Sequence, residues 1–162
     1  MAGTTTRTVD TDLYREDFHL WTQRQAQLLR QRRFTDVDLE HLIEEIEDLG
    51  SSQRSAVESH VINILWHLLK LQFSPAVPPR HGWEITVEAQ RIGLKRRLTA
   101  SLRNHVAAEL QQLYADARRL AVRDLRQDSV PADRLPLDCP YMLDQILDSD
   151  WFPANIHSLA DG

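Results

Sequence analysis

Apolar side chains recur every three or four residues along most of the chain, which is the spacing of one face of an α-helix. The pattern is longest between residues 38 and 73 and ends in the most apolar stretch, "VINILWHLLKLQF". Its heptad phase runs through Gly50 without a break, whereas a loop would reset the phase. We therefore predict one long helix from about Asp38 to Phe73, in which Gly50 costs about 1 kcal/mol of helix stability.

Three further amphipathic helices are predicted by the same spacing. The first begins at Asp12 and ends near "RQRRF", the third has an apolar stripe over residues 83–98, and the fourth has one over residues 102–121. The prolines of "SPAVPPRHG" separate the long helix from the third, because proline cannot continue a helix.

The C-terminal part of the chain predicts one short final helix at "YMLDQIL", after which Trp151 and Phe152 fold back onto the other helices. No segment shows the alternation of a strand. The fold class expected is all-α: a four-helix bundle with one long second helix and a short C-terminal helix.

The length of 162 residues fits one domain. Residues 1–11 are polar and lack periodicity, so we expect a flexible N-terminal arm. Residues 12–153 are expected to form a single helical-bundle domain, and residues 154–162 a C-terminal tail.

Composition is that of an ordinary globular protein, with 42% hydrophobic and 27% charged residues. The single cysteine, Cys139, cannot form an internal disulfide, and the N-terminal residues have no apolar segment typical of a secretory signal. The apolar run at residues 61–73 is shorter than the roughly 20 residues that span a bilayer. We expect a cytoplasmic protein with no membrane partner.

Charge is unevenly distributed along the chain. Residues 1–60 carry 7 Lys/Arg against 12 Asp/Glu, residues 80–126 carry 10 against 5, and residues 127–162 carry one Arg against 7 Asp. The simplest interpretation is that acidic and basic helices lie against one another within the fold.

Several segments together resemble a family of bacterial proteins, and they occur over residues 14–153. They are "DFHLWTQRQAQLLRQRRFTDVDLEHLIEEIEDLG", "ILWHLLKLQFSP", the Trp83, Thr86, Gln90 and Arg91 pattern, and "CPYMLDQIL" with the later Asp and "FP". The family is the one catalogued as domain of unknown function 29. The resemblance implies an all-helical, cytoplasmic bacterial protein, and it implies no activity.

Two histidines in the long helix are the first candidates for chemistry. His60 and His67 are seven residues apart and lie on the same side, roughly 10.5 Å apart along the axis. That separation is too large for both to bind one zinc ion without ligands from other helices. The alternative is structural: His67 would then donate one hydrogen bond to a neighbouring side chain such as Gln90 or Tyr114, or to a carboxylate.

Acidic side chains of "EEIED", which include Glu44, suggest a general acid or base or a further metal ligand. If the long helix is continuous, Glu44 lies about 35 Å from His67, and the two residues cannot share a site within one chain. Acids near a helix start also stabilise the helix dipole, which is the structural alternative.

Basic residues of the third and fourth helices are candidates for contacts with phosphate groups. The set is Arg91, Lys95, Arg96, Arg97, Arg118, Arg119, Arg123 and Arg126. No recognised nucleic-acid motif accompanies them, so pairing with acidic helices is the preferred interpretation.

No motif of a known catalytic class is present: the chain has no phosphate-binding glycine loop, no paired cysteines and no Gly-x-Ser-x-Gly. Cys139 in "LDCPY" has no basic neighbour to activate it, so a half-buried structural thiol is expected. We expect a non-enzymatic helical protein, without a predicted cofactor, that acts through protein contacts and forms a homodimer. The alternative is a bundle, enzymatic or not, that binds a metal or small ligand through His60, His67 and carboxylates. A weaker alternative is nucleic-acid binding by the basic helices.

Overall fold

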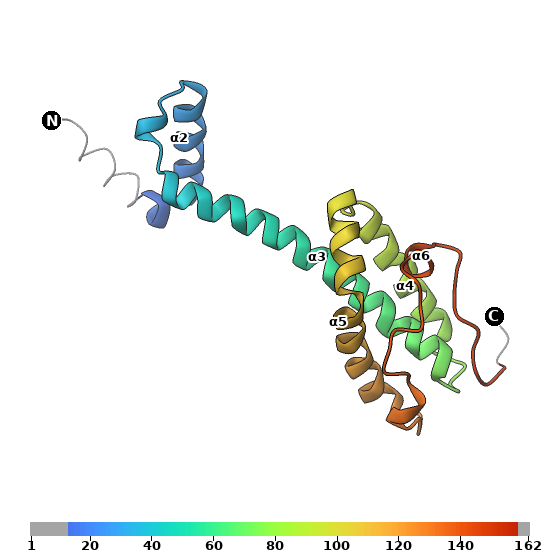
Figure 1. Ribbon diagram of the computed structural model, residues 1–162. Helices are drawn as coiled ribbons and strands as arrows, with labels where there is room; N and C mark the ends of the chain where they lie inside the picture. Colours follow the sequence, from blue (N-terminus) through green and yellow to red (C-terminus); the bar gives the residue numbers. More distant parts are fainter. Residues whose placement is uncertain (1–12, 159–162) are drawn as a thin grey trace. The chain divides into compact units, whose positions relative to one another are not determined.

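The structure, a computed structural model, describes residues 13–158 (Figure 1). Within that range the chain is helical and contains no strand, which confirms the all-α class. The predicted arm at residues 1–11 lies outside the described residues, as do residues 159–162 of the predicted tail.

Helix α3 spans Leu39–Phe73, so the predicted long helix is confirmed. The helix continues through Gly50, and apart from the neighbouring residues and backbone of the helix itself no atom lies within 4 Å of the place where a Cβ would stand at this residue. The contacts of the chain divide it into two compact units, Met1–Ser52 and Gln53–Gly162. The predicted domain boundaries, 12–153, are not tested by this division and stay a prediction.

The N-terminal unit contains α2 (Phe18–Arg30), the short 3-10 helix η1 (Phe34–Asp36) and the first turns of α3. The first helix does not run on from Asp12 as expected: residues 13–16 form a separate helical turn, and Asp17 adopts an extended φ of −146°. Its carboxylate accepts the backbone N–H of Leu20 and so caps α2. The left-handed Arg32 ends the helix, because Arg33 N then reaches the carbonyl of Leu28.

The C-terminal unit contains the second half of α3 together with α4 (Arg80–Lys95), α5 (Ala100–Leu125), η2 (Ala132–Arg134) and α6 (Leu143–Leu147). Their apolar side chains form one core. Its α3 members are Val57, Val61, Ile64, Leu65, Leu68, Leu69, Leu71 and Phe73. Buried residues on this half of α3 follow one another closely, so neighbours have to cover the helix on nearly every side.

The coil after α5 provides part of that cover. Trp151 and Phe152 pack against the core, which confirms that they fold back, and α6 matches the predicted short helix. Arg91, only 3% exposed, donates to the carbonyls of Gln145, Ile146 and Trp151 and thereby attaches this coil to α4.

A second arginine and one asparagine hold the coil at other points. Arg118 of α5 donates to the carbonyls of Ala132, Leu135 and Pro136. Asn155 donates to the carbonyls of Leu71 and Ser74 at the end of α3. The last carbonyls of a helix lack partners within the helix, so Asn155 acts here as part of its C-terminal cap.

The glycines of α4 provide a test of its packing. A Cβ on Gly93 would lie 2.6 Å from the Cε1 atom of His60, whereas nothing lies within 4 Å of one on Gly82. Alanine favours a helix over glycine by up to about 1 kcal/mol. We expect Gly82→Ala to raise the free energy of unfolding, and Gly93→Ala to lower it by about 1 kcal/mol because the His60 ring must move.

Urea unfolding of both variants, followed by circular dichroism, measures the difference. Equal stabilisation by the two substitutions would show that Gly93 is not a packing requirement.

Candidate functional site

An apolar groove of about 390 Å³ runs along the N-terminal unit, between α2 and the first turns of α3. Its walls come from Phe18, Trp21, Thr22, Gln25, Ala26, Leu29, Leu42, Glu45, Ile46 and Leu49. Glu45 is the one ionisable residue among them. Pockets of this size and polarity are typical of ligand or peptide binding.

Large apolar side chains around the groove are exposed to an unusual degree. Ile46 is 61% exposed and Leu49 is 65% exposed, and Leu39 and Ile43 on the same helix are exposed as well. Among residues 13–52, the described part of this unit, the buried apolar side chains are few: Trp21, Leu28 and Val37. A unit with so small a core gains little stability from burial of its own surface.

Buried polar contacts fix the base of the groove. Asp38 is 6% exposed, and its backbone N–H donates to Gln25 Oε1 at 2.8 Å. Its carboxylate accepts the indole N–H of Trp21 at 3.2 Å and Nδ1 of His41 at 2.8 Å. These bonds connect α2 to the start of α3, so the two walls hold a defined spacing.

Tyr14 fixes the acidic residue of the groove. Its hydroxyl donates to Glu45 Oε1 at 2.6 Å, and its ring stacks on His41 with centroids 4.1 Å apart. The hydrogen bond to Glu45 is the main reason why the pKa of Tyr14 rises to about 12, followed by desolvation. Tyr14 therefore stays a neutral donor at physiological pH and keeps Glu45 in place.

The two walls carry opposite charge. Helix α2 has two arginines, Arg24 and Arg30, and no Asp or Glu, whereas residues 38–48 have six acids and no Lys or Arg. The groove is therefore an apolar strip with a basic helix on one side and an acidic helix on the other.

The predicted histidines have structural partners in the C-terminal unit. His60 Nδ1 donates to Gln90 Oε1 at 2.7 Å. His67, 9% exposed, donates from Nδ1 to the backbone carbonyl of Asn63 at 2.9 Å, and not to the side chain expected from sequence. Desolvation is the main reason why the pKa of His67 is lowered.

Glu44, the third candidate, is exposed and belongs to the N-terminal unit, whereas both histidines belong to the other unit. Across residues 13–158, no three His, Cys, Asp or Glu side chains gather in a way that could hold a metal ion. The metal-binding alternative stays a prediction without an assembled ligand set in that range.

Comparison with known families identifies the family of the chain. The model of the family described as domain of unknown function DUF29 matches residues 13–152, which is most of the chain. The chain belongs to the DUF29 family. This confirms the resemblance found in the sequence, and the family description assigns no activity. No curated protein and no solved structure matches the chain.

One cluster in this DUF29 chain was missed by sequence reasoning. Lys70 is 7% exposed, its Nζ lies 3.4 Å from Asp124 Oδ2, and it stands over the rings of Trp66 and Trp83 at 4.7 and 5.0 Å. Desolvation lowers the pKa of Lys70, and Asp124 opposes that shift. The contact between Lys70 and Trp66 could have been predicted, because the two residues are four positions apart and such residues are neighbours on a helix.

Two of the eight basic residues considered as phosphate contacts are used within the fold. Arg91 is buried, and Arg118 directs its donors to the backbone of the coil. These two arginines therefore bond to backbone carbonyls, and not to the acidic helices expected from the sequence. Lys95, Arg96 and Arg123 remain exposed. None of the helices in the described part of the DUF29 chain is long and apolar enough to cross a membrane.

Cys139 is half-buried, as expected. Its Sγ atom lies 3.4 Å from the carbonyl of Tyr141, and desolvation raises the pKa of the thiol. A raised pKa leaves the thiol protonated and poorly nucleophilic.

The lowered pKa of His67 predicts how the free energy of unfolding depends on pH. As the pH falls, His67 of the unfolded chain takes up a proton first, because its pKa there is near 6.5 and the pKa of His67 in the folded protein is lower. The free energy of unfolding should therefore fall as the pH drops from about 7 to 5. His67→Asn keeps an N–H donor for the carbonyl of Asn63 but does not titrate, so its stability should fall less.

The matched control is His81→Asn, because His81 has a side chain that is 85% exposed. Urea titrations at several pH values give the slopes. If the slope of His67→Asn equals that of the unaltered protein, desolvation of His67 is not the cause.

Proposed function

We propose that this protein acts through protein contacts, and that its first contact is with a second copy of itself. In this proposal, the groove of one N-terminal unit packs against the same groove of the other copy. The observation that carries it is the exposed apolar strip beside the groove, set against the small core of that unit.

Burial of the strip supplies the driving force. Leu39, Ile43, Ile46 and Leu49 follow the three- and four-residue spacing of a coiled-coil seam on α3. Complete burial of one such side chain stabilises a complex by about 1.5–3 kcal/mol. A soluble chain exposes a continuous strip of this kind at an energetic disadvantage unless another surface covers it.

Charge favours a second copy over an unrelated partner. A two-fold axis places the same patch of both copies in contact, so the basic α2 of one chain can lie on the acidic start of α3 of the other. The complementary pattern within one unit is then repeated between the two chains. An acidic or basic partner would be attracted to one wall and repelled by the other.

The finer expectations from sequence belong to this proposal. Two copies of the N-terminal helical pair would supply four helices around one apolar seam, and the four-helix bundle predicted within a single chain stays a prediction. A bacterial and cytoplasmic setting follows from the family resemblance.

The proposal is tested by the mass of the full chain in solution. We expect a dimer by size-exclusion chromatography with light scattering. Ile46→Lys should weaken it at least about tenfold, because the substitution removes apolar burial and faces the basic α2 of the partner. Ile46→Glu should weaken it less, since the same helix attracts an acid.

The matched control is Ile92→Lys, which alters a 56% exposed isoleucine on α4, outside the groove. This variant should remain dimeric. A monomeric unaltered protein at high micromolar concentration would overturn the proposal, as would equal dimerisation of all variants. A complex with a different protein that depends on Ile46 would replace the second copy as the occupant.

A further inference from the structure

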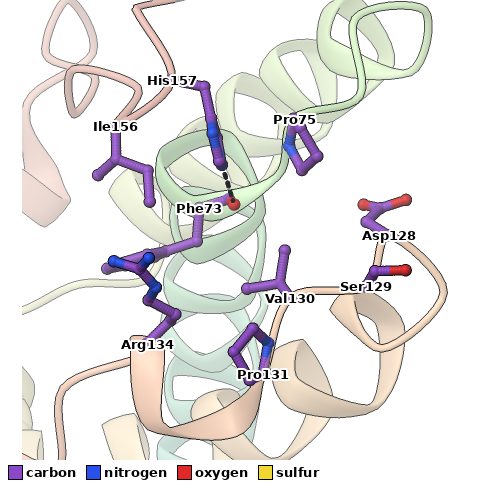
Figure 2. A pocket seen from close by; sticks show the side chains of 9 residues that line it. All are labelled: Phe73, Pro75, Asp128, Ser129, Val130, Pro131, Arg134, Ile156 and His157. Atoms are coloured by element: carbon purple, nitrogen blue, oxygen red, sulfur yellow. Dashed lines mark hydrogen bonds between the residues drawn. The ribbon is translucent and has the colours of Figure 1, made fainter.

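A second pocket lies in the C-terminal unit, beside the end of α3, and has a volume of about 440 Å³ (Figure 2). Its lining combines apolar and polar side chains: Phe73, Pro75, Asp128, Ser129, Val130, Pro131, Arg134, Ile156 and His157. We propose that this pocket binds a small carboxylate with an apolar body, with Arg134 as the residue that binds the carboxylate. This inference is independent of the groove and of self-association.

The backbone around the pocket is held on each side. At the end of α5, Ser129 has a left-handed φ of 59°, which lets Val130 N bond to the carbonyl of Leu125. This closes the helix and turns the chain into the pocket wall. Arg118 holds the next turn, η2, by donating to the carbonyl of Ala132 at 2.8 Å. Arg134 therefore projects from a fixed support.

The opposite wall is fixed by the cap on α3. Ile156 N donates to the carbonyl of Gln72 at 3.0 Å, and His157 Nε2 donates to the carbonyl of Phe73 at 3.1 Å (Figure 2). Because Nε2 carries that proton, Nδ1 of a neutral His157 is an acceptor. Because this wall is already ordered, less conformational entropy is lost when a ligand binds.

The polar side chains of the lining differ in whether they already have hydrogen-bond partners. Asp128 accepts the hydroxyl of Ser74 at 2.6 Å, and His157 is engaged with Phe73. Within residues 13–158, Arg134 makes no ion pair and no side-chain hydrogen bond, so its five donors are available. A guanidinium with free donors pairs with a planar carboxylate, or with a phosphate, through two parallel hydrogen bonds.

The positions of the charges set the orientation of the ligand. In Figure 2, Arg134 and Asp128 lie on opposite sides, with Val130 between them. A carboxylate at Arg134 thus lies away from the acid, and an apolar body can contact the rings of Phe73 and Pro131. Phosphate and other small hydrophilic anions have no apolar body that could make this second contact.

Binding is tested by calorimetry on the full chain with three probes: phenylacetate, its neutral amide phenylacetamide, and inorganic phosphate. We expect phenylacetate to bind at least tenfold more tightly than either of the others. Arg134→Gln should lower its affinity at least tenfold, whereas Arg123→Gln, which alters an exposed arginine outside the pocket, should not change it.

Thermal unfolding of both variants verifies that they are folded, as expected for exposed side chains. Absence of phenylacetate binding at several millimolar would overturn the inference. Equal binding of the acid and the amide would overturn the role of Arg134, and phosphate binding equal to that of phenylacetate would overturn the role of the apolar wall. None of these results depends on the oligomeric state.

Discussion

Burial of the second half of α3 is the constraint on which the C-terminal unit depends. From Val57 to Phe73 the buried side chains follow one another so closely that one neighbouring helix cannot cover them. The helices α4 and α5 cover part of the surface, and a coil with little regular structure covers the rest. The coil has to be attached by side chains because it has no helix ladder of its own, and Arg91, Arg118 and Asn155 do this by donating to backbone carbonyls.

The same burial determines the state of the polar groups in this unit. A buried cation is unfavourable unless it is paired, and Lys70 has a carboxylate and two indole rings around it. Most basic side chains near the core are therefore used for structure and are not available to a ligand. Arg134 differs from them, since it borders a pocket without a partner among the described residues.

The first half of α3 is less completely buried than the second half. It is apolar on one side, and within the N-terminal unit α2 covers only part of that side. Asp38 connects the two helices by polar contacts with Gln25 and Trp21, and these hydrogen bonds fix the geometry of the pair. An apolar strip with rigid support and opposite charge on its two borders is the surface on which self-association is proposed.

The sequence by itself determined the all-α class, the long helix through Gly50, the short helix at residues 143–147 and the inward position of Trp151, because helical periodicity is a local property of the chain. It also carried the DUF29 resemblance. Only the tertiary structure decided that His60 and His67 bond to Gln90 and Asn63, that Arg91 is buried, and that residues 155–157 cap α3. Spacing along one helix gives the side on which a residue lies, but the group that meets it there comes from distant segments, whose position depends on packing of the whole unit.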